Sequence, residues 1–200
     1  MNANQTFGLV CAHHHLYSSL ARGMPSPDKI PSSFGDILNS VWWKLDRALD
    51  LETIEWSAKL GALEALERGT TCIIDHHESP NAIEGSLSVI QNACNELGVR
   101  VNTCYGVSDR NSNEFSTNMP MTEEARRGLE ENRRFLREGG VGMVGIHAAF
   151  TCSDETLNSA AQLAVDMGVG VHVHVAEGDL DAISWRRLQQ HASNDWILVH

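Results

Sequence analysis

The sequence predicts an α/β protein built around a parallel sheet. Short runs rich in β-branched residues alternate with longer segments whose apolar residues recur at helical spacing. Glycine follows the helical segments at Gly69, Gly98, Gly139 and Gly168, where a helix often ends in a left-handed residue. Apolar strands joined through helices are typical of a parallel sheet covered on both faces.

The elements follow one another in a regular order. The predicted strands are residues 7–12, 70–75, 99–105, 141–147, 169–175 and 196–200. Helical spacing of apolar residues predicts helices within 54–66, 83–97 and 157–167. Thr122 and Ser153 are each followed by two acidic residues, which predicts helix starts at both positions because acids are favoured at the positive end of the helix dipole.

The number of elements limits the architecture. We expect about six strands and five helices, whereas a closed TIM (β/α)8 barrel needs eight of each and roughly 250 residues. The chain has 200 residues. A partial TIM barrel therefore competes with a doubly wound open sheet, and we favour the partial barrel, with residues 1–200 forming a single truncated domain.

The composition narrows the range of partners and the location. With 26 acidic and 15 basic side chains, the net charge is −11, which argues against nucleic acid and against an anionic membrane surface. The chain contains five cysteines, without a C-x-x-C pair, and its amino-terminal segment lacks the charge and apolar run of a signal peptide. We expect a cytoplasmic protein.

Histidines gather where the predicted strands end. All but one of the ten histidines lie in or just after a strand: His13, His14, His15, His76, His77, His147, His172, His174 and His200. The carboxyl ends of parallel strands open onto one face, so we expect these rings to converge there.

The spacing of these histidines predicts a metal site. His13 and His15 point the same way from a strand, whereas His14 is turned aside. Two neutral imidazoles on one side form half of a divalent metal site, and His174 is a third candidate ligand. Glu177 follows just beyond the strand end, where a carboxylate could take a proton from metal-bound water.

Other residues have simpler readings. We expect His14, His76 and His77 to be structural, and Trp42 and Trp43 to pack a helix rather than to form a substrate platform. His172 has the same strand parity as His174, which leaves its part in the site open.

Several passages together resemble the metal-dependent amidohydrolase superfamily, in particular its aminohydrolase branch of chlorohydrolases and cytosine deaminase-like enzymes. They are GLVCAHHHLYSSLARGMP, ALERGTTCIID, GIHAAFTCSDETL, HVHVAEGD and ILVH, in that order along the chain. The stretches WWKLDRALD and DHHESPNAIEGSL resemble SsnA-type aminohydrolases.

The resemblance implies a mechanism. His13, His15 and His174 would bind one divalent metal ion, and Glu177 would shuttle the proton. We expect zinc, with iron as the alternative, since imidazole suits both. His200 would polarise the substrate or hold the attacking water, and His147 would contact the substrate. The implied reaction is attack of metal-bound hydroxide on a cyclic amidine carbon of a small nitrogen heterocycle, with release of ammonia.

The resemblance also sets its own limits. The family carries an aspartate after the eighth strand that completes the metal site, and a flanking β-sandwich. We expect both to be missing from this chain. Three alternatives stay open: release of chloride or an alkylamine from a triazine-like ring, an inactive metal-binding fragment, and an open-sheet nucleotide binder. The last lacks a G-x-G-x-x-G turn after the first strand. Whether the chain forms a homo-oligomer is also open.

Overall fold

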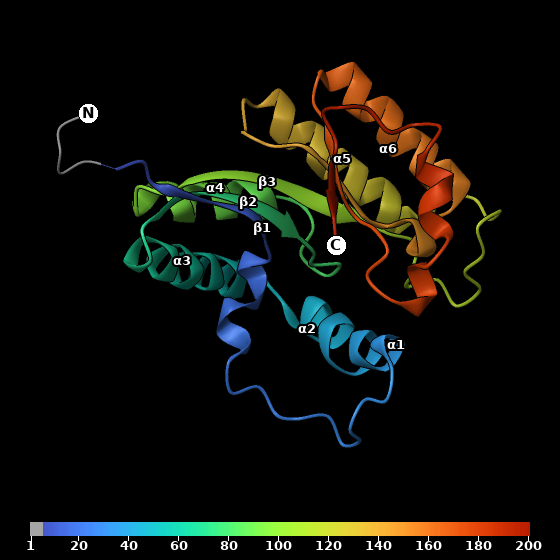
Figure 1. Cartoon of the computed structure of the whole chain (residues 1–200), viewed down its shortest axis with the longest axis horizontal. Helices are drawn as coiled ribbons and strands as arrows, with labels where there is room; N and C mark the ends of the chain where they lie inside the picture. The colour runs from blue at the N-terminus through green and yellow to red at the C-terminus, as the bar shows by residue number, and fades with distance from the viewer. Residues whose placement is uncertain (1–5) are drawn as a thin grey trace.

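The computed structural model describes residues 6–200, which form one six-stranded sheet with helices around it (Figure 1). Residues 1–5, on which the signal-peptide expectation partly rests, lie outside the described residues. The strands are β1 (Leu9–His14), β2 (Thr70–His77), β3 (Arg100–Val107), β4 (Val144–Ala148), β5 (Val171–His174) and β6 (Ile197–Val199). The α-helices are α1 (Phe34–Ile37), α2 (Trp43–Ala48), α3 (Leu51–Glu67), α4 (Ser86–Glu96), α5 (Glu123–Arg137) and α6 (Asp154–Met167).

The strand order settles the architecture. Neighbouring strands are parallel, and their order in the sheet is their order along the chain, β1 to β6. A doubly wound sheet would reverse direction at a switch point, whereas a barrel adds strands in one direction only. The predicted partial TIM barrel is therefore confirmed.

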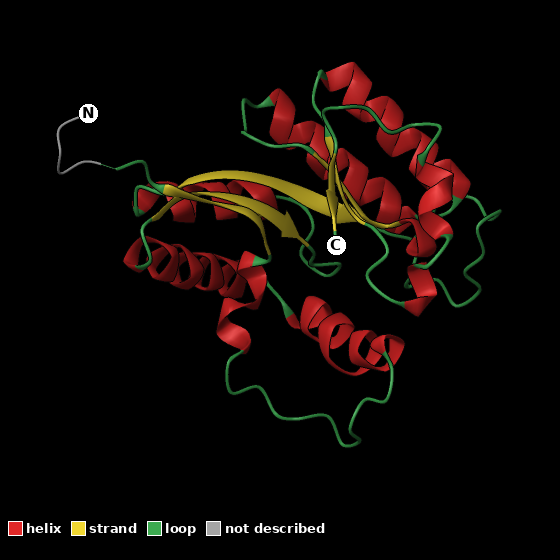
Figure 2. Ribbon diagram, viewed as in Figure 1, coloured by secondary structure: helices red, strands yellow, loops and turns green. Residues whose placement is uncertain are grey.

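The sheet is strongly curved (Figure 2). Its first and fifth strands face each other across the concave side, where His13 Nδ1 of β1 lies 2.9 Å from His172 Nε2 of β5. Helices α3 and α4 lie on the outer side of β1–β3, and α5 and α6 accompany the later strands. The concave side is thus the interior of the partial barrel, and histidines fill much of it.

Apolar side chains fill the space between the sheet and the outer helices. One cluster joins α3 and α4 to β2 through Ile54, Ile90 and Ile73, and a second joins α6 to β4 through Leu157 and Ile146. Side chains alternate along a strand, so Ile73 packs outward on the helices while His76 faces the interior. This division keeps the polar chemistry on one side of the sheet.

The predicted helix starts at Thr122 and Ser153 are confirmed. The Thr122 hydroxyl accepts the Ala125 N–H at 3.1 Å, and the Ser153 hydroxyl accepts the Thr156 N–H at 3.2 Å. Both caps are also tied to Asp109, which is buried just after β3. Its two carboxylate oxygens accept the N–H of Thr122 and the N–H of Ser153, each at 2.8 Å.

The connection between β5 and β6 differs from the regular helix that a count of five suggested. It contains two short 3-10 segments, Asp179–Asp181 and Ser184–Leu188. Their side chains bond to the backbone of neighbouring segments: Arg187 donates to the carbonyl oxygens of Ala149 and Cys152. In residues 6–200, no helix has the length and apolar composition needed to cross a membrane.

Candidate functional site

The concave side brings His13, His15 and His174 together. Each offers one ring nitrogen, and the three nitrogens lie within 4.8 Å of one another. His13 and His15 come from the end of β1 and His174 from the end of β5. His15 and His174 are 159 positions apart in the sequence and meet because the sheet is curved. His14 does not join this group.

Backbone carbonyls fix the orientation of two of these rings. The Nδ1–H of His15 donates to His76 O at 2.7 Å, and the Nδ1–H of His174 donates to His147 O at 2.7 Å. A carbonyl oxygen can only accept, so Nε2 of each ring carries a lone pair. These two Nε2 atoms lie 3.2 Å apart.

Two lone pairs at this separation cannot bond to each other, but a shared cation fits them. Two ligands of a tetrahedral zinc ion, each with a Zn–N distance of about 2.0–2.1 Å, would be about 3.3 Å apart. The donor set of three imidazoles suits zinc and other borderline divalent ions. The residues therefore fit a divalent metal ion.

Burial keeps these imidazoles neutral. It lowers the pKa of His15 to about 3 and that of His13 to about 4, with the nearby histidines adding to both shifts. Burial also holds the pKa of His174 well below its usual range. Only the neutral ring has a free lone pair, so all three are in the ligating form at neutral pH.

Glu177 and His200 lie beside this group. Glu177 Oε1 is 3.8 Å from His200 Nε2, and burial raises the pKa of Glu177 while His200 opposes the shift. The turn that carries Glu177 passes through Ala176 at φ 58°, a left-handed conformation that alanine rarely adopts. Asp181 holds this turn, since its Oδ2 accepts the Ala176 N–H at 2.6 Å.

His147, at the end of β4, faces the same space. Its Nδ1 lies 2.7 Å from the Thr151 hydroxyl, which itself donates to Ala148 O at 3.0 Å. The hydroxyl proton is thus used, so His147 donates through Nδ1–H and keeps the Nε2 lone pair free.

These side chains line one cavity of about 260 Å³. Its walls are His13, His15, Tyr17, Leu38, Trp42, Trp43, Asp46, Glu78, His147, His174, Glu177 and His200. All six residues proposed from the sequence therefore meet at one cavity. The expectation for Trp42 and Trp43 was incomplete, because both indoles also line it. The volume is near the lower end of the range for small-molecule sites.

Sequence reasoning missed a buried ion cluster in the cavity wall. Arg110 pairs with both Asp46, at 2.6 Å, and Glu78, and its guanidinium lies 5.5 Å from the centre of the Trp43 ring. Arg110 and Asp46 are separated by 64 residues, so no local spacing links them. The only signal in the sequence was that both are charged residues beside an apolar segment or a loop near the site.

His76 and His77 have the structural contacts expected of them. His76 donates from Nε2 to Ile146 O at 3.0 Å, and His77 bonds the Ser79 hydroxyl through Nε2 at 2.8 Å. His172, left open from the sequence, lies against His13 with its Nε2 2.9 Å from His13 Nδ1. His172 therefore helps to position His13, one of the candidate metal ligands.

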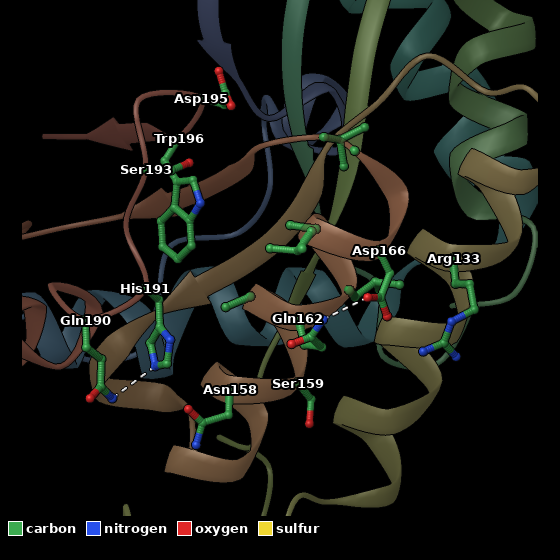
Figure 3. A pocket seen from close by; sticks show the side chains of 16 residues that line it. Arg133, Asn158, Ser159, Gln162, Asp166, Gln190, His191, Ser193, Asp195 and Trp196 are labelled. Carbon is green, nitrogen blue, oxygen red and sulfur yellow. Dashed lines mark hydrogen bonds between the residues drawn. The ribbon is translucent and has the colours of Figure 1, made fainter.

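A second, larger cavity of about 960 Å³ lies on the outer side of α6 (Figure 3). Gln162, Asp166 and Trp196 are among the side chains around it. None of the six residues proposed from the sequence lines it. The six residues proposed from the sequence thus lie on the concave side and not at this outer groove.

Comparison with known proteins identifies the family of the chain. The model of the Amidohydrolase family matches residues 6–192. A 5'-deoxyadenosine deaminase of Methanopyrus kandleri is 33% identical over 178 residues, which are 85% of this chain and 36% of that protein. A 5-methylthioadenosine/S-adenosylhomocysteine deaminase of Moorella thermoacetica is 30% identical over 184 residues, 90% of this chain and 39% of that protein.

Solved structures share the fold. The atrazine chlorohydrolase TrzN of Arthrobacter aurescens, complexed with zinc, superposes with a TM-score of 0.73 at 22% identity, covering 96% of this chain and 48% of that chain. Guanine deaminase of E. coli gives a TM-score of 0.75 at 17% identity, covering 96% of this chain and 46% of that chain.

The chain thus spans less than half the length of these relatives, and the 5'-deoxyadenosine deaminase of M. kandleri is covered only to 36%. The family match nevertheless runs through nearly the whole chain and includes every strand but the last. The predicted resemblance is confirmed: the chain belongs to the amidohydrolase family.

Proposed function

We propose that this chain carries the metal-binding half of the active site of an aminohydrolase that deaminates a cyclic amidine in a small nitrogen heterocycle. The observation that supports it most is the trio of neutral imidazoles with two converging lone pairs 3.2 Å apart. Relatives named as deaminases at 30–33% identity support the reaction class. A cytoplasmic location is part of the same proposal.

In this proposal His13, His15 and His174 hold one divalent ion, zinc in preference to iron. When bound, such an ion supplies a water whose pKa is lowered toward neutrality. Backbone carbonyls of neighbouring strands keep the His15 and His174 rings aimed at one point.

Glu177 is proposed as the proton shuttle. Its carboxylate, which lines the cavity and has a raised pKa, takes the proton of the attacking water and delivers it to the leaving nitrogen. His200, 3.8 Å away, lies where it can polarise the ring nitrogen of the substrate or hold the water.

His147 is proposed to contact the substrate. Because its Nδ1–H is used by Thr151, the ring can only accept from the ligand, so it would bind a substrate N–H. Trp42 and Trp43 supply the apolar wall against which a flat ring can lie.

Ammonia release tests the proposal. The protein, loaded with zinc, is assayed against adenine nucleosides, free purines, pterins and triazines, and ammonia, chloride and alkylamine are measured separately. Ammonia from at least one amino-heterocycle is expected. Release of chloride or alkylamine alone would support the triazine-type alternative instead, and zinc binding without any turnover would support a non-catalytic metal-binding chain.

A further inference from the structure

Glu78 is the one carboxylate of the ion cluster that faces the histidines. It follows directly after β2 and is almost fully buried, and Arg110 Nη1 pairs with its Oε2. Gly106 of β3 leaves room for it, because a Cβ there would lie 2.9 Å from Glu78 Oε1 and 2.3 Å from His76 Cε1. The other oxygen, Oε1, is therefore the one left to interact with neighbouring groups.

Those neighbours are two hydrogen-bond acceptors. Glu78 Oε1 lies 3.8 Å from His147 Nε2 and 3.8 Å from His76 Nδ1. His147 keeps a lone pair on Nε2 because its Nδ1–H bonds Thr151, and His76 keeps one on Nδ1 because its Nε2–H bonds Ile146 O. Within the described residues, His76 Nδ1 has no hydrogen-bond partner.

Glu78 Oε1, His147 Nε2 and His76 Nδ1 thus form a cluster of acceptors at the cavity wall, in which Glu78 Oε1 lies 3.8 Å from each ring nitrogen and His76 Nδ1 is buried without a partner. A buried acceptor without a donor is costly, about 1–3 kcal/mol for a neutral group and more for a charged one. Among the described residues, the group that could hold a metal ion is His13, His15 and His174, so a metal ion does not account for these three acceptors. They lack a donated hydrogen.

Burial raises the pKa of Glu78 to about 8 against the opposing pull of Arg110, so a proton on this carboxylate supplies that hydrogen in the empty cavity. A ligand N–H would take its place once that proton is released to solvent, which leaves the carboxylate charged. The three acceptors also lie close to the proposed metal ligands. The ring of His147 is 5.7 Å and that of His76 is 4.5 Å from the ring of His174, centre to centre.

We propose that Glu78 is a specificity-determining residue: its Oε1 accepts a hydrogen bond from a second N–H group of the substrate, distinct from the amine on the reacting carbon. The inference rests on the proposed function of this cavity. The preferred substrates are then diamino-heterocycles or amino-heterocycles with a ring N–H, and Asp46 with Arg110 keeps the carboxylate in place.

Matched ligand pairs test this inference by binding rather than by turnover. 9-Methyladenine, which has no ring N–H, is compared with 9-methyl-2,6-diaminopurine, and 4-aminopyrimidine with 2,4-diaminopyrimidine, by calorimetric titration of the zinc-loaded full chain. In the wild type, the diamino member of at least one pair is expected to bind about 10- to 100-fold more tightly, the range for a hydrogen bond to a charged group.

Glu78→Gln should remove or invert that preference. Arg110 donates only, so it would hold the amide oxygen and leave the amide NH2 in the place of Oε1, turning an acceptor into a donor. Glu78→Asp, which keeps the charge but withdraws it by one methylene, should lower the ratio as well and serves if the glutamine variant does not fold. Glu131→Gln is the control, because Glu131 is equally buried but pairs with Arg134 on α5.

Each outcome decides the inference. Equal affinities within both pairs for the wild type, a ratio unchanged by either Glu78 variant, or no binding of any ligand would overturn it. Ammonia measured on the same samples separates the two proposals. A Glu78-dependent preference without ammonia leaves the inference standing and removes the deaminase. Ammonia with no effect of Glu78 does the reverse.

Discussion

The orientation of each imidazole in the trio is set by the strand beside it. His15, just after β1, donates to a carbonyl of β2, and His174 of β5 donates to a carbonyl of β4. Hydrogen bonds to the backbone of the neighbouring strands thus fix the Nδ1–H tautomer of both rings and orient Nε2 toward the cavity. No extra side chain is needed to orient these two rings.

Glu177 allows a test of the proposed shuttle. Glu177→Gln keeps the shape of the side chain but cannot accept the proton, so turnover of the zinc-loaded protein should fall at least about 100-fold. Zinc content, measured by elemental analysis, should not change, because Glu177 is not one of the three grouped ligands. Glu130→Gln on the exposed face of α5 is the control. A variant that keeps more than a tenth of the activity would show that another group moves the proton.

At the scale of elements, Asp109 links two helices to the end of β3. Asp109→Ala leaves the N–H groups of Thr122 and Ser153 without their acceptor, so α5 and α6 each lose a contact at the amino-terminal end. The free energy of unfolding should fall by about 3 kcal/mol.

Urea unfolding followed by far-ultraviolet circular dichroism measures this change. Asp166→Ala, at the exposed end of α6, should change the stability by no more than about 0.5 kcal/mol. Equal effects of the two substitutions would mean that Asp109 does not hold the helices.

Most elements could be predicted because their signals are local. The capping residues Thr122 and Ser153 and the helical spacing from Ile54 onward lie within one turn or one helix. The β5–β6 connection could not be predicted, because its conformation depends on contacts such as those of Arg187 with carbonyl groups of residues 149 and 152. Those partners lie 35 to 38 residues earlier.

The residues of the site likewise divide into those that the sequence could predict and those that it could not. His13, His15 and His174 could be found because a parallel barrel brings all strand ends to one face. Glu78, Arg110 and Asp46 could not, because their pairing follows from the way α2 packs onto the loops after β2 and β3. Only the folded chain brings one guanidinium between two carboxylates.

At the scale of the whole molecule, buried titratable groups predict how stability varies with pH. Burial lowers the pKa of His13, His15, His76, His77, His147, His172 and His174. The unfolded chain therefore binds more protons than the folded chain between about pH 4 and pH 6.5, and stability rises with pH in that range.

Three buried carboxylates act in the opposite sense. Burial raises the pKa of Asp46 to about 6, of Asp75 to about 7 and of Glu78 to about 8, so the folded chain holds protons that the unfolded chain has lost. Their contribution to stability is lost as the pH rises toward 8. Below pH 6.5 the more numerous histidines determine how stability changes with pH, and above pH 6.5 the three carboxylates do.

For the metal-free protein, the urea midpoint should therefore rise from pH 5 to pH 6.5 and decline gently from pH 7 to pH 9. Denaturation curves in a chelating buffer at pH 5, 6.5, 8 and 9 check this. A midpoint that falls steadily from pH 5 upward would mean that the histidines are not buried in neutral form.

The central claim is that three imidazoles from two distant strands hold one cation. Zinc bound per chain, measured after dialysis of the wild type, His174→Ala and His191→Ala, a partly buried control outside the cavity, tests it most directly. We expect about one zinc ion per chain in the wild type and the control, with nitrogen ligands in the X-ray absorption spectrum, and less than about a tenth of that in His174→Ala. Zinc retained in full by His174→Ala, or no stoichiometric zinc in the wild type, would contradict the account.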